Sequence, residues 1–476
     1  MKTPTGPDLW RWTATDLARA VRTRAVSARD AVGAALERMR AVNPLLNAVT
    51  VDLGDQALLA AEAVDRAVAR GEALGPLAGV PVTIKQNVDQ VGCATTNGVV
   101  AWKDLIAEAD APVVANWKAA GAVVIGRTNT PAFSIRWDTD NALYGPTQNP
   151  FSSGHTPGGS SGGAAAAVAT GIGALAHGND LGGSVRYPAY ACGVAGLRPS
   201  FGRVPAFNAT APAERPPSTQ LMSVQGPLAR TVADLRLGLE TLAARDPRDP
   251  WWVPAPLAGP PPRRPVRVAL LDEAPAFGAA RIHADVRAAV AQAARWLADA
   301  GYAVERVPTP SCARAVEIWQ ALQCNEIRRL MGPLIESHGD DGVRTAARFF
   351  VESTPEVTLD EYMKLLAART QAVREWSLFL ERHPLVLMPA SLEPPFPRGF
   401  DVTSQARMDE ALDAQRPQLL VPVLGTPAVA VPTGLGGGLP LGVQIMGPRF
   451  REDLCLDAAQ VVEARAPVLT PIDPRP

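Results

Sequence analysis

A lysine and two serines, far apart in the sequence, have the residue types that acyl transfer requires. Lys85 closes the apolar run 80–84, and it is one of only five lysines among 46 basic residues. An apolar strand disfavours the charged form of an amine, so a lysine held there can be neutral near neutral pH and act as a base. Ser160 and Ser184 each stand in a glycine-dense turn. One basic amine and two hydroxyl groups together predict nucleophilic attack on a carbonyl carbon.

The two glycine-dense segments have different alternative explanations. Residues 156–163 could be a flexible linker, but the helix-forming run 164–169 follows at once, so the turn adjoins an ordered element. Residues 179–188 could be a tight turn with an incidental serine, and for this segment alone that explanation is as good as a catalytic one. Consecutive N–H groups in such a turn can also converge on a developing oxyanion beside Ser184. The second turn is therefore a candidate oxyanion hole.

Two further motif matches are weak. Residues 158–162 fit G-x-S-x-G with Ser160 as nucleophile, but that motif needs a hydrophobic strand directly before it, and residues 152–157 are turn formers. Residues 171–176 fit G-x-G-x-x-A without the strand before it or the acidic residue about 20 positions later that a dinucleotide site needs. We interpret the whole run 164–176 as a buried helix, too short to span a bilayer.

Helix and strand patterns alternate around these residues. Ser27 followed by Asp30 predicts a helix start, with apolar spacing that carries the helix to about residues 43–44. Further helices are expected over 55–71, 111–120, 285–300 and much of 313–382, and strands over 80–85, 121–126, 267–271, 304–307, 385–388 and 428–431. This alternation predicts an α/β sheet covered on both faces. The proline-rich stretch 254–265 fits a surface insertion better than a domain linker, because α/β patterns continue after it.

Composition excludes several classes of function. Among the 476 residues, 46 basic and 47 acidic side chains nearly balance, which is unlike the basic footprint of a nucleic-acid-binding protein. The five cysteines lie far apart without zinc-ligand spacing, which indicates reduced, structural thiols. The N-terminus lacks the apolar core of a secretory signal, and no window approaches 18 uninterrupted apolar residues. We expect a cytoplasmic protein that binds neither nucleic acid nor membrane and uses no metal or cofactor.

Taken together, Lys85, the turn around Ser160 and the segment 180–188 resemble the amidase signature family, including the 24-residue interval between the two serines. Other segments continue the likeness in order: 43–48, 77–81, 126–131, 424–428, 431–434 and 440–444. The resemblance implies one α/β/α sandwich over residues 1–476, with a large mixed central sheet. It also implies variable, pocket-shaping insertions near 205–265 and 310–405.

The resemblance assigns a role to each residue of the candidate site. Ser184 is then the nucleophile, Ser160 a bridging serine that follows a cis peptide bond, and Lys85 the base. A neutral Lys85 would accept a proton from Ser160, which takes one from Ser184, and water would hydrolyse the resulting acyl-enzyme. The oxyanion hole is expected from four backbone N–H groups: Leu181, Gly182, Gly183 and Ser184.

Two positions depart from the family pattern. Gln86 stands where the family usually has an acidic residue after the lysine, and Ala132 replaces a frequent glutamate. Neither belongs to the proposed relay, so the expectation of activity is unchanged. Loss of an anion at position 86 would slightly lower the pKa of Lys85, because less negative charge would support the ammonium form.

The expected reaction is hydrolysis of a carboxamide or related C(=O)–N bond, in an amide, an anilide or a carbamate (urethane). Candidate contacts for an apolar or aromatic substrate are Phe133, Ile135, Trp137, Tyr144 and Trp319, although core packing explains most such residues. A monomer or homodimer acting on a small molecule is expected. Two alternatives stay open: the glutaminase-type component of an amidotransferase, which needs a partner chain, and a catalytically silent scaffold.

Overall fold

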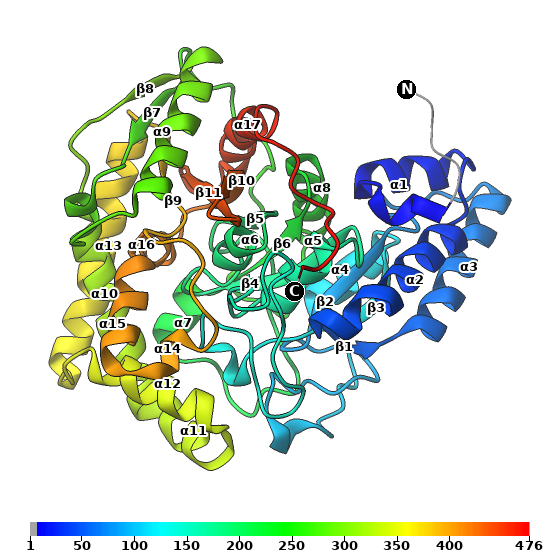
Figure 1. Cartoon of the computed structure of the whole chain (residues 1–476), viewed down its shortest axis with the longest axis horizontal. Coiled ribbons are helices and arrows are strands. Elements are labelled where there is room, and N and C mark those ends of the chain that lie inside the picture. Colours follow the sequence, from blue (N-terminus) through cyan, green and yellow to red (C-terminus); the bar gives the residue numbers. More distant parts are fainter. Residues whose placement is uncertain (1–6, 476) are drawn as a thin grey trace.

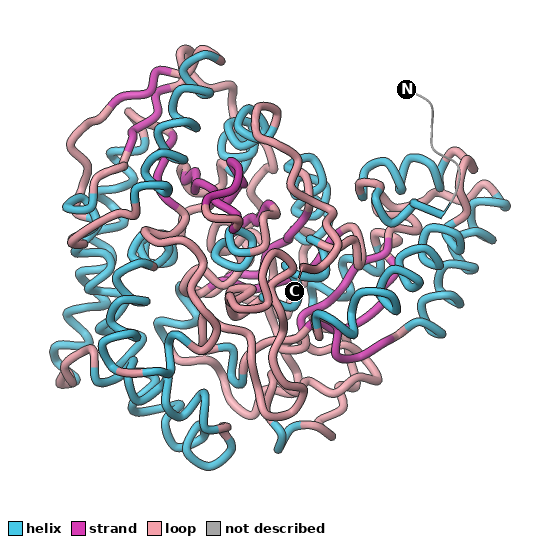
Figure 2. The backbone as a smooth tube through the Cα atoms, viewed as in Figure 1, coloured by secondary structure: helices cyan, strands magenta, loops and turns pink. Residues whose placement is uncertain are grey.

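One mixed β-sheet of eleven strands runs through the molecule. The structure is a computed structural model, and it describes residues 7–475. Figure 1 shows the strands through the middle of the molecule, and Figure 2 shows helices and loops around them. The strand order across the sheet is β1-β3-β2-β4-β6-β5-β10-β11-β9-β7-β8. The expected fold class, an α/β fold around a large mixed sheet, is confirmed.

Parallel and antiparallel pairs occur in the same sheet. The strands are β1 (Val49–Asp52), β2 (Pro81–Lys85), β3 (Val123–Thr128), β4 (Leu175–Asp180), β5 (Ala195–Arg198), β6 (Val224–Ala229), β7 (Arg267–Leu270), β8 (Ala303–Glu305), β9 (Leu385–Pro389), β10 (Ala428–Gly436) and β11 (Leu439–Met446). β2 lies between β3 and β4 and is parallel to both. The ends of these strands therefore bring Lys85 and the segment after β4 to the same edge of the sheet.

Alternation along the strands divides the apolar side chains between two faces. On β10, Val429 and Val431 pack with one set of helices, whereas Ala430 packs on the opposite side with other elements. The first face is covered by α1 (Ala14–Arg22), α4 (Pro112–Ala119), α8 (Val232–Leu242), α9 (Ala284–Asp299) and α17 (Glu452–Glu463). The apolar side chains through which these helices contact the sheet are almost completely buried, so burial of apolar area holds the helices on the sheet.

The second face carries two groups of helices. Over β2, β3 and β4 lie α2 (Ala28–Leu46) and α5 (Gly162–Ala169), with α3 (Gly54–Arg70) packed on α2. The helix α6 (Arg186–Ala191) lies over β5, β10 and β11. The second group is the helical block seen at the left and lower left of Figure 1: α10 (Cys312–Glu326), α11 (Gly332–His338), α12 (Asp341–Glu352), α13 (Leu359–Leu380), α14 (Phe400–Thr403), α15 (Gln405–Ala414) and α16 (Arg416–Leu424). Helices thus cover both faces of the sheet, as expected.

Most predicted elements are present, with shifted ends. α2 has Ser27 as its N-cap, as expected, but it runs through Pro44 to Leu46, where Asn47 ends it in a left-handed conformation. The side-chain oxygen of Asn43 accepts hydrogen bonds from the N–H groups of Ala48 and Val49, so the chain leaves the helix in an ordered turn. α3 ends at Gly71, as predicted.

The expected helix over 164–176 is wrong in its second half. α5 ends at Ala169, because Gly171 and Gly173 both adopt positive φ angles, and β4 begins at Leu175. The range 205–265, expected as a pocket-shaping insertion, includes the central strand β6 as well as the helices α7 (Pro217–Met222) and α8. These differences matter for the site, because β4 leads directly into the segment that carries Ser184.

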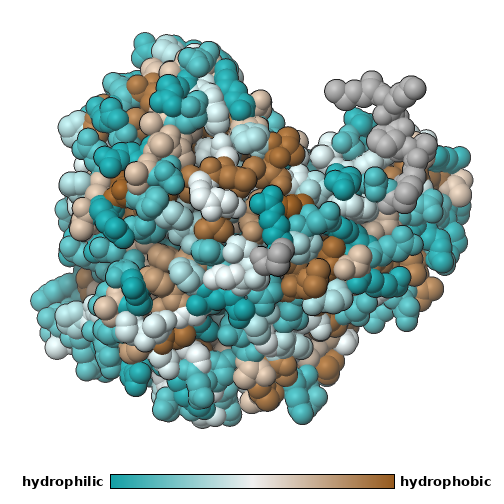
Figure 3. Space-filling view, viewed as in Figure 1, coloured by the Kyte–Doolittle hydropathy of each residue, from teal (hydrophilic) through white to brown (hydrophobic). Residues whose placement is uncertain are grey.

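The surface seen in Figure 3 is mainly hydrophilic, with hydrophobic residues in separate patches. Within residues 7–475, none of the helices combines the length and apolar character that crossing a membrane requires.

Candidate active site

Lys85 lies at the end of β2 with its side chain fully buried. Its Nζ is 2.7 Å from Ser160 Oγ, 3.1 Å from Ser161 Oγ and 2.8 Å from Asn179 Oδ1. Burial lowers the pKa of Lys85 well below its ordinary value, and the nearby Asp180 carboxylate offsets only part of this effect. Burial therefore favours the neutral form of the amine, which is the direction that the apolar strand predicted.

The three contacts of the Lys85 amine are all with oxygen atoms that can accept a hydrogen bond. A neutral amine has two N–H donors and one lone pair, and the Oδ1 atom of Asn179 can only accept. Nζ is the donor to all three oxygens in the structure. A serine hydroxyl can also donate to the lone pair of a neutral amine, so Ser160 and Ser161 both lie within reach of Lys85 as a base.

Ser160 is held where the backbone turns sharply into α5. The peptide bond between Gly159 and Ser160 is cis, as predicted. Gly159 packs so closely on the backbone of residues 136–138 that a Cβ atom would overlap the Arg136 carbonyl. Ser160 and Ser161 are both buried, and on β4 a Cβ at Gly178 would come within 2.8 Å of Ser161 Oγ. Glycines thus allow the turn and β4 to approach each other.

Ser184 follows β4 in the loop 181–185, and its side chain is partly exposed. The N–H of Ser161 donates to the Ser184 carbonyl over 3.2 Å, which joins the two serine-bearing turns. The structure therefore brings Lys85, Ser160 and Ser184, which are far apart in the sequence, to one region of the sheet edge.

A buried ionic cluster fixes the start of this loop. The Asp180 carboxylate accepts hydrogen bonds from Arg186 and Arg198, and the three side chains are fully buried. Burial alone would raise the pKa of Asp180, but the two guanidinium groups hold it well below its ordinary value. Arg198 also donates to the carbonyl groups of Asp180 and Met222. Asp180 is thus a permanent anion at the junction of β4 and the loop.

The four N–H groups expected in the oxyanion hole are not equivalent. Gly183 donates its N–H to Asp180 Oδ1 over 3.0 Å, so in this structure it is directed into the protein. Among the described residues, the N–H groups of Leu181, Gly182 and Ser184 have no hydrogen-bond acceptor. The expected set of donors is thereby reduced to these three.

Four of the five expected aromatic or apolar contacts lie in one cluster. Trp137, Trp319 and Phe133 are buried in it, and Ile135 packs against it. Trp137 and Trp319 donate hydrogen bonds to the loop that carries Ser184. Tyr144 lies outside this cluster, and its carbonyl accepts a hydrogen bond from Asn47. Contact with the loop that carries Ser184 distinguishes Trp137 and Trp319 from the other candidate residues, whereas burial in the core does not.

The two departures from the family pattern lie beside the site but do not contact the Lys85 amine. Gln86 binds Thr96 and Asn129 through its side chain. The expected effect of position 86 on the pKa of Lys85 acts through charge rather than contact, and it stays a prediction. Ala132 is buried before Phe133 and Ser134, which both have positive φ angles.

Sequence reasoning missed the roles of Asn179, Ser161 and Arg198. The sequence shows Asn179 only as the first residue of a turn, although its position directly before Asp180 is a signal that could have drawn attention to its amide. Arg198 carries no sequence signal for its contact with Asp180, because strand β5 places it there only in three dimensions.

Comparison with known proteins identifies the family. Residues 30–456 match the family model described as Amidase. The chain belongs to the amidase signature family. An indoleacetamide hydrolase of Bradyrhizobium diazoefficiens is 48% identical over 98% of this chain and 88% of its own length. A glutamyl-tRNA(Gln) amidotransferase component of Acidothermus cellulolyticus is 33% identical over 96% of this chain and 95% of its own.

Solved structures agree with this membership. A 6-aminohexanoate cyclic dimer hydrolase superposes with a TM-score of 0.82 at 28% identity, covering 97% of this amidase and 98% of that chain. A bacterial aryl acylamidase gives a TM-score of 0.81 at 28% identity, covering 97% of each chain. The protein is thus a hydrolase of carbon–nitrogen bonds in amides.

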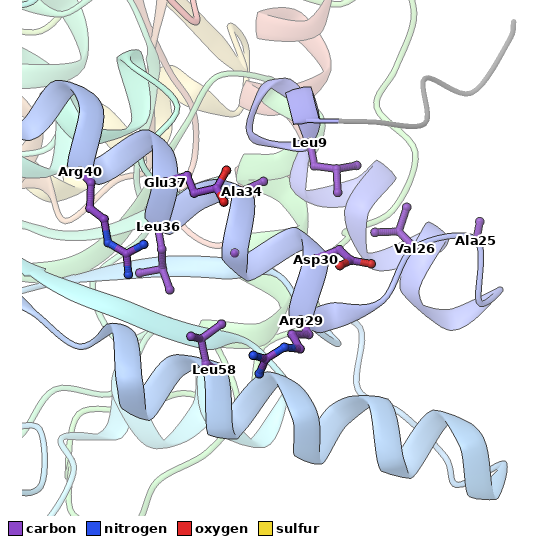
Figure 4. A pocket seen from close by; sticks show the side chains of 11 residues that line it. Leu9, Ala25, Val26, Arg29, Asp30, Ala34, Leu36, Glu37, Arg40 and Leu58 are labelled. Carbon is purple, nitrogen blue, oxygen red and sulfur yellow. The ribbon is translucent and has the colours of Figure 1, made fainter.

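A surface hollow of about 610 Å³ lies elsewhere on the amidase, between the N-terminal helices and α3 (Figure 4). Arg29, Asp30, Glu37 and Arg40 line it together with apolar side chains. None of the candidate site residues borders this hollow. The candidate active site therefore rests on the chemistry of Lys85 and the two serines, and not on the size of a hollow. In residues 7–475, no group of three His, Cys, Asp or Glu side chains could hold a metal ion.

The contact between Asn179 and Lys85 gives a testable pH dependence. In Asn179→Asp, a carboxylate beside the amine would favour the ammonium form and raise the pKa of Lys85 by about one to three units. The acid limb of the kcat/KM profile reports the base of the free amidase, so it should move to higher pH by the same amount. His177 does not titrate in this range, because burial lowers its pKa to about 3.

A pH series of initial rates for the wild type and Asn179→Asp makes the comparison. The matched control is Gln292→Glu on α9, which adds one negative charge at a side chain that already accepts a hydrogen bond from Arg295. This control should leave the acid limb of the kcat/KM profile at its wild-type pH. An unmoved limb in Asn179→Asp would show that Lys85 is not the group that titrates.

Proposed function

We propose that this amidase hydrolyses the primary amide of an arylacetic acid, of the indoleacetamide type, through a Ser184–Ser160–Lys85 relay. The observation that carries the relay is the fully buried Lys85 amine, 2.7 Å from Ser160 Oγ and suited to be neutral. The substrate class rests on 48% identity to an indoleacetamide hydrolase over nearly the whole chain. Two tryptophans next to the Ser184 loop fit an aromatic substrate.

The proposed proton path begins at the contact between Lys85 and Ser160 and continues to Ser184 on the neighbouring turn. Lys85 Nζ takes the hydroxyl proton of Ser160, Ser160 takes the proton of Ser184, and Ser184 Oγ bonds to the amide carbon. The carbonyl oxygen becomes an anion that backbone N–H groups of the loop 181–184 stabilise. The proton returns to the nitrogen, ammonia leaves, and water then attacks the acyl-Ser184 ester to release the carboxylic acid and restore the hydroxyl.

A substrate panel tests this proposal. Indole-3-acetamide, phenylacetamide, phenylacetanilide, an aryl carbamate and L-glutamine would be compared by ammonia, amine or acid release. We expect the two primary arylacetamides to have kcat/KM at least about tenfold above the anilide and the carbamate, since a pocket shaped for one leaving group discriminates by such factors. A preference for the carbamate or the anilide would replace the proposed substrate class but keep the relay.

The glutaminase alternative has a specific observation behind it, the 33% identity to a component of a glutamyl-tRNA(Gln) amidotransferase. It predicts that glutamine is the best substrate and that turnover needs a partner chain. We propose instead that the protein acts as a monomer or homodimer. Two measurements on the purified chain separate these alternatives: its activity on arylacetamides without a partner chain, and its molar mass in solution by light scattering.

A further inference from the structure

Two indole N–H groups donate to consecutive carbonyls of the loop that carries Ser184. Trp319 Nε1 lies 2.9 Å from the Leu181 carbonyl oxygen, and Trp137 Nε1 lies 3.1 Å from that of Gly182. Both tryptophans are buried, with 4% and 7% of their surface exposed. In a buried setting these hydrogen bonds do not compete with water, so each one fixes the carbonyl that it holds.

Holding a carbonyl also sets the direction of the next N–H. The peptide unit is planar and trans, so its C=O and N–H point in opposite directions. The bond from Trp319 to the Leu181 carbonyl turns the N–H of Gly182 away from Trp319. The bond from Trp137 to the Gly182 carbonyl turns the N–H of Gly183 away from Trp137, and that N–H is found on Asp180 Oδ1. In the Gly182–Gly183 peptide the N–H thus points away from the indole that holds the carbonyl, and the same relation applies to the Leu181–Gly182 peptide.

The loop needs such restraint because its backbone is unusually free. Gly182 and Gly183 have no side chains to limit rotation of the two peptide units between Leu181 and Gly183. Gly183 has a φ of 98°. Trp319 also fills the space above Gly182, where a Cβ atom would come within 2.8 Å of the Trp319 ring. Without the indole, the peptide that contains the Gly182 N–H could rotate.

We propose that Trp319 is a positioning residue for the oxyanion hole: its indole N–H holds the Leu181–Gly182 peptide so that the Gly182 N–H stays available to the substrate oxyanion. Trp137 holds the carbonyl of the next peptide in the same way, and the N–H of that peptide, on Gly183, is directed to Asp180. This inference rests on the proposed function, since it concerns the stabilisation of an oxyanion formed at Ser184.

The aromatic contacts explain how the helical block reaches the loop. Trp319 is on α10, Trp137 lies in the segment after β3, and both rings contact Phe350 on α12 edge to face. The ring centroids are 5.7 Å and 6.3 Å from that of Phe350. Side chains outside the glycine-rich segments thereby set the backbone geometry of the catalytic loop.

The two tryptophans should differ in importance. The Gly183 N–H has a second anchor in Asp180, whereas the Gly182 N–H depends on Trp319. Removing one oxyanion donor costs about 10²–10³ in kcat in other enzymes, so loss of its orientation should cost less. We expect Trp319→Phe to lower kcat by about 10–100-fold and Trp137→Phe by a smaller factor, with KM of each within about threefold of wild type.

The test measures kcat, KM and the inhibition constant of a tetrahedral mimic, an arylmethyl boronic acid. A positioning role raises this inhibition constant by the same factor as it lowers kcat/KM, because the hole binds the tetrahedral state more tightly than the substrate. Trp376→Phe is the matched control: Trp376 is a buried indole on α13 whose Nε1 has no hydrogen-bond partner among the described residues, so kcat should stay the same.

A second variant covers loss of packing. Trp319→3-benzothienylalanine keeps the ring shape and removes only the N–H, and it should reproduce the kcat loss of Trp319→Phe with an unchanged melting temperature. Full kcat and full boronate affinity in this variant would overturn the inference while the proposed function stands. A loss confined to KM would also overturn it, because a pocket wall alone would then explain Trp319. A wild-type chain that hydrolyses no arylacetamide would instead contradict the proposed function and remove the basis of both.

Discussion

Replacing Ser184 with alanine is expected to lower kcat for amide hydrolysis by at least about 10⁴-fold, because no acyl-enzyme can form without the nucleophilic oxygen. The fold should be unaffected, since the Ser184 hydroxyl is partly exposed and makes no hydrogen bond to the described residues. Rates are measured with the best arylacetamide of the panel, and stability by thermal unfolding.

A second measurement on the same variant locates the nucleophile directly. A fluorophosphonate probe should label the wild type at Ser184, as found by peptide mass spectrometry, and should not label Ser184→Ala. Ser337→Ala on α11 removes an exposed hydroxyl far along the chain and serves as the matched control with full rate and labelling. Undiminished turnover by Ser184→Ala would refute the relay, and an unlabelled but folded wild type would favour the silent scaffold.

Replacing Asp180 with asparagine is expected to destabilise the protein by about 3–5 kcal/mol, because it leaves buried guanidinium groups without their counter-charge. The side chains of Arg186 and Arg198 are fully buried, so water cannot replace the carboxylate. The variant also loses the carboxylate that accepts from the N–H groups of Gly183 and Val185, so the loop that carries Ser184 should loosen. Urea unfolding, followed by circular dichroism, measures the change.

The control for this prediction is Asp457→Asn, which breaks an ion pair with Arg236 on the surface. Both partners are about half exposed, so the unfolding midpoint should hardly change. If Asp180→Asn unfolded at the wild-type midpoint, the buried cluster would not be what holds the loop.

The parts of the site that the sequence predicts are those with local signals. Lys85 could be placed at the end of a buried strand because the apolar run before it is short and unbroken. The cis peptide before Ser160 followed from the resemblance. Strand β4 was missed because it follows an alanine-rich run, and its sequence from Leu175 to Asp180 has no β-branched residue to favour a strand.

Contacts between distant segments could not be predicted in this way. Trp319 donates to Leu181 across 138 positions, and neither residue carries a pattern that reveals the other. The Gly183 N–H was expected in the oxyanion hole, but the Asp180 side chain three residues earlier takes it. Hydrogen-bond competition of this kind depends on side-chain directions, which periodicity does not give.

The burial of Lys85 has a practical consequence for attaching the protein to solid supports. The other lysines in the described part of the chain, Lys103, Lys118 and Lys364, are exposed. Amine-reactive coupling chemistry needs access to the nitrogen, so among the described lysines it meets these three amines and leaves the Lys85 amine unmodified. With so few lysines in the chain, immobilisation through amines has few and known points of attachment, none of them in the proposed relay.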